Sequence, residues 1–183
     1  MFQTENSLLV IVDVQEKLFD VMHDKDRFLS SICQLAKVAQ ILALPVLVAE
    51  QYPEKLGPTV EPLELILSES PTLFSKIAKR TFSCLEDQAF RETLELSRRK
   101  QILLAGIESH ICVFQTAARL LCAGFEVQVL SDAVSSRTLF NKEIGLARCA
   151  RLGADLTSVE SAAFEMLKTS TAPQFRQISA IIK

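Results

Sequence analysis

The sequence predicts a doubly wound, Rossmann-like α/β fold, in which a six-stranded parallel sheet carries helices on both faces as a three-layer sandwich. First, its apolar runs of strand length are continuous rather than alternating, as in strands buried on both faces. Second, these runs alternate with stretches of helical periodicity, the pattern of a parallel sheet. Third, 183 residues with 49% hydrophobic content are enough for one such domain, residues 1–183.

The chain begins with two predicted strands on either side of a long helix. Ser7–Asp13 is a short apolar run rich in β-branched residues, which indicates a buried strand. Arg27–Leu44 has apolar residues at helical spacing, and Pro45 forbids its continuation. We therefore expect a helix there, with Val46–Ala49 as the second strand.

A turn-rich stretch and a weaker strand come next. Glu50–Pro71 contains four prolines and a glycine, and its length suggests a surface excursion near a site. Within it we expect only a helical turn, at Leu63–Leu67. Thr72–Ser75 is a weak candidate for the third strand, and Leu85–Ser97 has the spacing of an amphipathic helix.

The second half repeats the alternation of strand and helix. Gln101–Gly106 is a fourth buried strand, and a helix from about His110 to Cys122 is closed by Gly124, a typical residue just beyond a helix end. The remaining expected elements are strands at Phe125–Leu130 and Leu156–Val159, and helices at Lys142–Arg151, Ser161–Leu167 and Gln174–Ile182.

Charge and hydropathy exclude several classes of protein. A net charge of −2 does not attract a polyanion, and the densest basic cluster is only Arg98-Arg99-Lys100, so we expect no nucleic-acid partner. No apolar stretch approaches the roughly 20 residues that span a bilayer, so we expect no membrane partner. The first residues lack the basic start and cleavage site of a secretory signal, which predicts a cytoplasmic protein.

The composition also argues against bound cofactors. His23 and His110 are the only histidines, and no cysteines lie closer than Cys112 and Cys122, so no zinc-type spacing exists. The five glycines form neither a GxGxxG motif nor a phosphate-binding loop. We therefore expect no metal and no organic cofactor. An odd number of cysteines, five, favours free thiols over a disulfide framework.

Two chemically active residue types follow neighbouring strands of the predicted sheet. In the common six-strand order the winding reverses between the first and fourth strands, and sites lie beyond their carboxyl ends. Asp13 ends the first strand, and Cys112 follows the fourth. Each has an ordinary alternative, because Asp13 could cap a turn and Cys112 could be a small buried hydrophobe.

Together, the two residues suggest a nucleophile and its base. A thiol at a helix start is expected to favour its thiolate, and an adjacent carboxylate can accept the proton. A nearby cation is then required, and spacing alone does not choose among Lys76, Lys79 and Arg80. We assign the four other cysteines to packing.

Four segments resemble one known family in the same order. These are Val12-Asp-Val-Gln15, Lys79-Arg-Thr-Phe-Ser83, Gly106-Ile-Glu-Ser-His-Ile-Cys112 with the residues after it, and Asp132-Ala-Val-Ser-Ser-Arg137. The chain is thereby identified as similar to the isochorismatase-like cysteine hydrolases, which include nicotinamidase. The resemblance covers nearly the whole chain.

The resemblance implies a catalytic triad of Asp13, Lys79 and Cys112, since the family lysine stands three residues before the Phe-Ser pair. It also implies a cis peptide bond between Ile107 and Glu108, and an oxyanion hole made by the backbone N–H groups of Glu108 and Cys112. The implied reaction cleaves a C–N amide-type bond of a small molecule through a Cys112 thioester. We also expect a homo-oligomer.

The sequence departs from nicotinamidases after the second strand, where Glu50–Gly57 lacks the histidine of their metal site. It is more similar to small, metal-free members of the superfamily. Candidate substrate contacts are Gln15, Phe19, Tyr52 and Phe82, although a turn contact for the first and core packing for the aromatic residues are alternatives. Two rival functions stay open: an idle enzyme acting as an oligomeric scaffold, and a nuclease.

Overall fold

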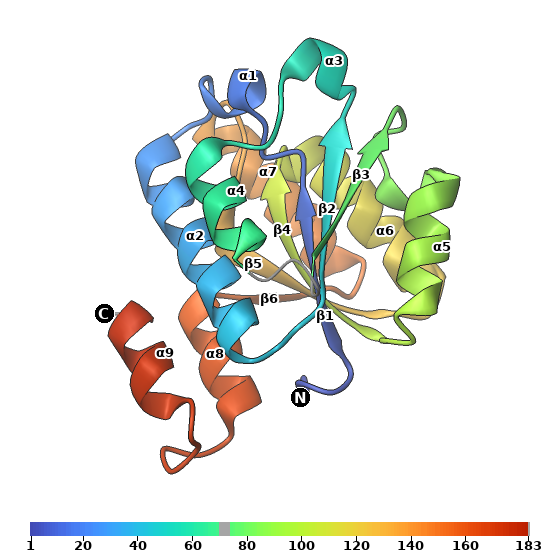
Figure 1. Cartoon of the computed structure of the whole chain (residues 1–183). Helices are drawn as coiled ribbons and strands as arrows, with labels where there is room; N and C mark the ends of the chain where they lie inside the picture. Colours follow the sequence, from blue (N-terminus) through green and yellow to red (C-terminus); the bar gives the residue numbers. More distant parts are fainter. Residues whose placement is uncertain (70–73, 183) are drawn as a thin grey trace.

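A computed structural model describes residues 1–69 and 74–182 of the chain. In this part, six strands form one all-parallel sheet in the order β3-β2-β1-β4-β5-β6 (Figure 1). The predicted fold class is confirmed. The strands are β1 (Ser7–Val12), β2 (Val46–Gln51), β3 (Phe74–Lys79), β4 (Gln101–Ile107), β5 (Glu126–Ser135) and β6 (Asp155–Thr157).

Helices cover both faces of the sheet (Figure 1). On one face, the core includes residues of α2 (Lys25–Ile41), α4 (Glu61–Ser68), α8 (Val159–Leu167) and α9 (Phe175–Ile182). On the other face lie α5 (Gln88–Leu96), α6 (Phe114–Cys122) and α7 (Leu139–Arg151). No helix in the described ranges is both long and apolar enough to cross a membrane.

Strand β1 shows why its sequence is apolar without alternation. Leu9 and Ile11 point into the core on the α2 side, whereas Leu8, Val10 and Val12 point into the core on the α6 side. All five are fully buried, because a central strand of a three-layer sandwich has no solvent face.

The winding reverses between β1 and β4, as the sequence predicted. The two strands approach closely at Gly106, which pairs with Val12. A Cβ atom on Gly106 would lie 2.1 Å from the carbonyl oxygen of Val12, and the residue has φ of +117°. Only glycine fits this position, which lies just before the segment that carries Cys112.

The third strand differs from its prediction, Thr72–Ser75. Strand β3 spans Phe74–Lys79, so it continues to the end of the lysine segment, while residues 72 and 73 lie outside the described part. The signal was weak because β3 is an edge strand with largely exposed side chains.

Several other boundaries differ in instructive ways. Two four-residue helices, α1 (Glu16–Phe19) and α3 (Pro53–Leu56), were not predicted because they are too short to show periodicity. Val159, predicted to end a strand, instead begins α8, where the Ser158 side chain accepts a hydrogen bond from the Ser161 N–H. Strand β5 continues past Leu130 to Ser135.

Candidate active site

Asp13 follows β1 directly and lies at the carboxyl edge of the sheet. Its backbone N–H donates to the carbonyl of Ala49, and its φ of +55° turns the chain away from the strand. The side chain is completely buried, and Oδ2 accepts a hydrogen bond from Lys79 Nζ at 2.8 Å. A carboxylate therefore sits, without solvent, at the point where the winding reverses.

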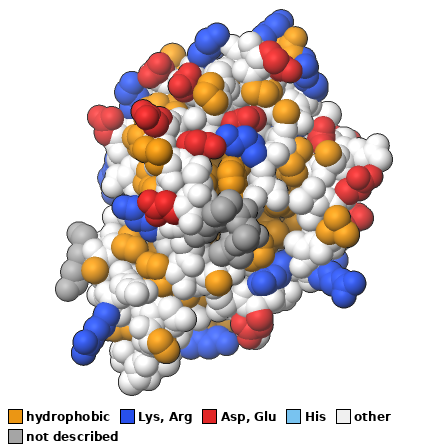
Figure 2. Space-filling model, in the orientation of Figure 1, with side chains coloured by type: hydrophobic (Ala, Val, Ile, Leu, Met, Phe, Trp, Pro, Cys, Tyr) orange, Lys and Arg blue, Asp and Glu red, His pale blue; other side chains and the backbone are white. Residues whose placement is uncertain are grey.

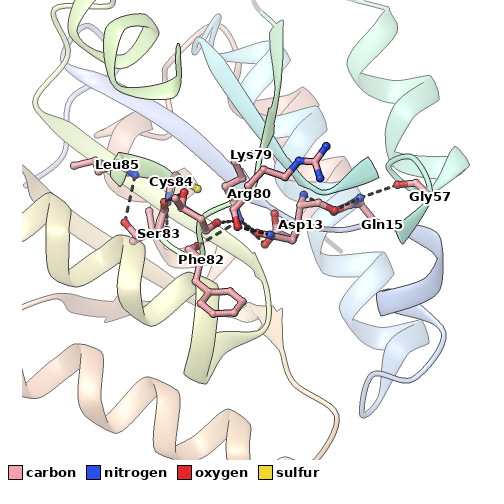
Figure 3. Close-up of polar contacts among 12 residues, drawn as sticks. Asp13, Gln15, Gly57, Lys79, Arg80, Phe82, Ser83, Cys84 and Leu85 are labelled. Carbon is pink, nitrogen blue, oxygen red and sulfur yellow. Dashed lines mark hydrogen bonds and ion pairs between the residues drawn. The ribbon is translucent and has the colours of Figure 1, made fainter. Parts of the chain in front are cut away.

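Lys79 is the last residue of β3, and its ammonium group is enclosed by acceptors (Figure 3). Besides Asp13, Nζ donates to Gln51 Oε1 at 2.7 Å, and to the carbonyl oxygens of Thr81 and Phe82 at 3.1 and 3.3 Å. Four acceptors thus surround a buried cation, which satisfies its hydrogen-bonding capacity.

The other two cations that spacing left open lie elsewhere. Lys76 forms ion pairs with Glu50 and Glu64, at 3.3 and 2.7 Å. Arg80 reaches outward to Glu54 and stacks on the ring of Tyr52. The structure therefore brings only Lys79 of these three to Asp13.

Cys112 lies in η3 (Ser109–Val113), a turn of π-helix between β4 and α6. It is 7% exposed and shares a pocket with Asp13. Asp13 Oδ1 is buried and has no hydrogen-bond partner within the described residues. This oxygen is available to the Cys112 thiol, while Oδ2 is held by the lysine.

Burial raises the pKa of the Cys112 thiol far above its ordinary value, and the neighbouring charge of Asp13 raises it further. Lys79 opposes this change but does not reverse it. The expectation that a helix start favours the thiolate is wrong here, since desolvation and a like charge outweigh the helix end.

The ion pair itself is also shifted by burial. Desolvation raises the pKa of Asp13 above 3.8, because the attraction of Lys79 compensates only in part. For Lys79, burial lowers the pKa, but the opposing charge of Asp13, with Cys84 and Cys112, raises it above 10.5 overall. Asp13 is thus a stronger base than an ordinary aspartate.

A small pocket of about 130 Å³ opens onto the Cys112 thiol. It is lined by Asp13, Leu18, Gln51, Leu56, Phe82, Glu108, Ile111 and Cys112. Of the four side chains predicted to contact substrate, only Phe82 lines this pocket.

The other three predicted contacts have different roles. Gln15 is fully buried, and its amide is used by backbone: Nε2 donates to the carbonyls of Gln51 and Gly57, and Oε1 accepts from the Gln51 N–H (Figure 3). Phe19 packs near Phe28, and Tyr52 lies under Arg80. Gln15 therefore holds two backbone segments together behind the pocket and does not line it.

Sequence reasoning missed several residues at this site. Gln51 ends β2 at the same sheet edge as Asp13, a position that could have indicated it. Leu18 and Leu56 come from the short helices α1 and α3, which left no sequence signal. The Glu108 carboxylate binds Arg137, whose Nε donates to Oε2 at 3.1 Å.

One further feature belongs to the segment before Cys112. The peptide bond between Ile107 and Glu108 is cis. Elsewhere in the described part of the chain, as here, no three His, Cys, Asp or Glu side chains gather in a way that would hold a metal ion. The five cysteines are free, and Cys122 is exposed, so the prediction that it serves packing is wrong.

The sheet order, with a buried acid, lysine and cysteine at its switch point, defines the class: an α/β protein with the isochorismatase-type hydrolase fold. A family model described as the isochorismatase domain matches residues 7–161. The chain belongs to this family.

Similar proteins agree with this assignment. A secreted isochorismatase effector of Phytophthora sojae is 37% identical over 97% of this chain and 85% of its own length. Isochorismatase domain-containing protein 2 of Rattus norvegicus is 36% identical, over 98% of this chain and 82% of its own. A solved structure described as MAR1 ribonuclease from Caenorhabditis elegans has a TM-score of 0.91 and 32% identity, covering 99% of this chain and 91% of that one.

Proposed function

We propose that this protein is a cysteine hydrolase that cleaves a C–N amide-type bond of a small molecule. The observation that carries the proposal is the buried Asp13–Lys79 pair whose second carboxylate oxygen is free beside a buried thiol. A base held in place by a lysine, next to a nucleophile, is the arrangement that covalent catalysis requires.

The first half of the reaction forms an acyl-enzyme. Asp13 takes the proton of the Cys112 thiol as sulfur attacks the acyl carbon, and the backbone N–H groups of Glu108 and Cys112 receive the developing oxyanion. Protonated Asp13 then gives that proton to the leaving nitrogen as the C–N bond breaks. The products are a free amine and a thioester on Cys112.

The second half restores the thiol. Asp13 removes a proton from a water molecule, whose oxygen attacks the thioester carbon. The C–S bond breaks, Asp13 returns the proton to sulfur, and a carboxylic acid leaves. Lys79 keeps one carboxylate oxygen fixed throughout, so that the other can shuttle the proton.

The test compares Cys112→Ala with Cys122→Ala across a panel of small primary amides. We expect the first variant to lose turnover by about 10³-fold or more and to form no acyl adduct detectable by intact-protein mass spectrometry. The second removes an exposed thiol and should retain activity. Full turnover by Cys112→Ala overturns the mechanism, whereas no turnover and no adduct from the unaltered protein favours the idle scaffold.

A second candidate, ribonuclease activity, is suggested by the description of the Caenorhabditis elegans relative. The site argues against it, because Asp13 and Glu108 both line a pocket of about 130 Å³. An entering phosphate would meet two carboxylates in a space smaller than a nucleotide needs. We therefore place amide hydrolysis first.

We also propose that the protein forms a homo-oligomer. Helix α7 exposes Phe140 and Ile144, four residues apart on one face, at 69% and 38% of their surface. Large apolar side chains grouped in this way are typical of interfaces. The mass in solution by light scattering tests this, and Phe140→Glu should reduce it.

The cytoplasm is the proposed compartment. Five free cysteines, two of them fully or almost fully buried at Cys84 and Cys149, are stable in a reducing environment. The Phytophthora sojae relative, by contrast, is described as secreted. Fractionation of cells and medium tests the proposal, and recovery of the native protein from the medium would contradict it.

A further inference from the structure

The size of the pocket at Cys112 limits the acyl group that can enter. Its volume of about 130 Å³ is well below the roughly 300 Å³ at which pockets for drug-sized ligands begin. A group that lies wholly inside this pocket is therefore small.

The walls of the pocket are apolar on several sides. Leu18 and Leu56 come from α1 and α3, Ile111 comes from η3, and Phe82 lies after β3. None of these side chains can donate or accept a hydrogen bond. An aliphatic group placed among them is favoured by removal from water.

The charges at the pocket disfavour an anion. Asp13 and Glu108 both line it. Their cationic partners lie outside the lining: Lys79 is enclosed by four acceptors, and Arg137 donates through Nε to Glu108 Oε2. A carboxylate in the acyl group would therefore find no cation to pair with among the residues that line the pocket.

The Gln51 side chain, which also lines the pocket, is similarly committed. Its Oε1 accepts from Lys79 at 2.7 Å, and its Nε2 donates to the carbonyl of Arg80 at 2.9 Å. Apart from the free Oδ1 of Asp13, the side chains of the pocket thus present apolar surface and occupied polar groups to whatever lies beside the thiol.

We propose that the Cys112 pocket selects short, uncharged aliphatic acyl groups, and excludes anionic and aromatic ones. The selection among substrates rests on the proposed amide hydrolysis. The selection among reagents that enter the pocket does not require turnover, and it is tested first.

The charge part is tested by alkylation with iodoacetamide and iodoacetate, which match in size and differ in charge. Sulfur forms a thioether bond as the C–I bond breaks, iodide leaves, and the thiol proton passes to Asp13. We expect the iodoacetamide-to-iodoacetate rate ratio to be at least tenfold larger at Cys112 than at exposed Cys122 in the same molecule, measured by peptide mass spectrometry. Equal ratios overturn the charge selectivity.

Glu108→Gln sharpens this test. The change removes one pocket carboxylate and releases the charge of Arg137, so the ratio at Cys112 should fall severalfold while that at Cys122 stays constant. An unchanged ratio at Cys112 means that Glu108 does not exclude anions.

The size part is tested with iodoacetamide and 2-iodo-N-phenylacetamide, in both of which the sulfur displaces iodide from a CH2 carbon while the thiol proton passes to Asp13. We expect the smaller reagent to react at Cys112 at least tenfold faster, and Leu56→Ala to reduce that preference. Leu65→Ala removes the same side chain from an exposed position, 61% accessible on α4, and should leave the preference unchanged. Equal rates for both reagents in the unaltered protein overturn the size limit.

The substrate form uses butyramide, succinamate and benzamide. We expect kcat/KM for butyramide to exceed that for the anionic and aromatic amides by at least tenfold. Preference for succinamate or benzamide overturns the inference while amide hydrolysis stands. If no amide is hydrolysed but the alkylation ratios hold, the proposed function fails and the pocket selectivity survives.

Discussion

Burial controls the chemistry of the three residues at the switch point. Asp13 and Lys79 are withdrawn from solvent completely, and each compensates the charge of the other. The Cys112 thiol beside them has a raised pKa because desolvation is the larger effect and Asp13 adds to it. Proton transfer is therefore expected during attack on the substrate rather than before it.

This ordering predicts the pH dependence of kcat/KM. Asp13 must be ionised to accept the thiol proton, so activity should fall as the pH drops through its pKa, which burial raises above 3.8. On the alkaline side, the raised pKa of Lys79 keeps the pair charged, so activity should persist beyond the ordinary cysteine pKa of about 8.5. A profile from about pH 4 to pH 10 measures this. Activity that appears only above about pH 8 would show that a free thiolate is the reacting form.

Lys79 is predicted to stabilise the fold as well as the site. Lys79→Met leaves the Asp13 carboxylate buried without its cation, and should lower the free energy of unfolding by about 3–5 kcal/mol. Arg80→Met, directly after Lys79, breaks only an exposed ion pair with Glu54 and should cost about 1 kcal/mol or less. Urea unfolding of both variants makes the comparison. Equal losses would contradict the special role of Lys79.

At the scale of elements, the site depends on segments that meet at one sheet edge. Gln15 joins three of them, since its side chain binds the backbone at Gln51, where β2 ends, and at Gly57, where α3 ends. Leu56 is thereby placed next to the β1 exit that carries Asp13. The hydrogen bonds of Gln15, which lie behind the pocket, thus hold Leu56 in the pocket wall.

Helix α7 supports the thiol segment through Gly145. A Cβ atom there would lie 2.5 Å from the carbonyl carbon of Ser109 and 2.6 Å from the amide nitrogen of His110, both backbone atoms of η3. Alanine would ordinarily stabilise a helix by about 1 kcal/mol over glycine. Here the clash with the backbone should cost about 1–3 kcal/mol and outweigh that gain, because no flexible side chain can move aside.

We therefore predict that Gly145→Ala lowers both stability and activity. Displacing η3 moves Cys112 relative to Asp13, and a misplacement of about 1 Å can cost about 10²-fold in rate. Ala147→Gly, at an exposed position of the same helix, should lose about 1 kcal/mol with kcat unchanged. Thermal unfolding and kcat are measured for both variants. Normal kcat in Gly145→Ala would mean that η3 tolerates the shift.

At the scale of the whole molecule, the charges are balanced and mixed. On the face drawn in Figure 2, Lys and Arg side chains are interspersed with Asp and Glu. The net charge is −2, so the long-range field does not gather polyanions.

This balance predicts that single-stranded RNA neither binds nor is cleaved. Non-specific RNA binding draws its affinity from neutralised phosphates, and is strongest at low salt. Filter binding at low ionic strength, with a cleavage assay alongside, should give no retention and no products. RNA cleavage that disappears in Cys112→Ala would reverse our order of the two candidate functions.

The sequence by itself determined the sheet, its strand order, and the places of Asp13 and Cys112 in the site. Continuous apolar strands exist only where both faces are covered, so this periodicity carries the fold class. The positions of Asp13 and Cys112 followed from the switch-point rule, while Lys79 was selected only through resemblance, because Lys76 and Arg80 have the same local character.

Tertiary structure alone decided the contents of the pocket and the state of the thiol. Leu18 and Leu56 lie on helices too short to leave a periodic signal, and the amide of Gln15 faces backbone contributed from distant positions. The pKa of Cys112 depends on how much water surrounds it and on which charges lie nearest. Both are properties of packing in three dimensions, which spacing along the chain does not encode.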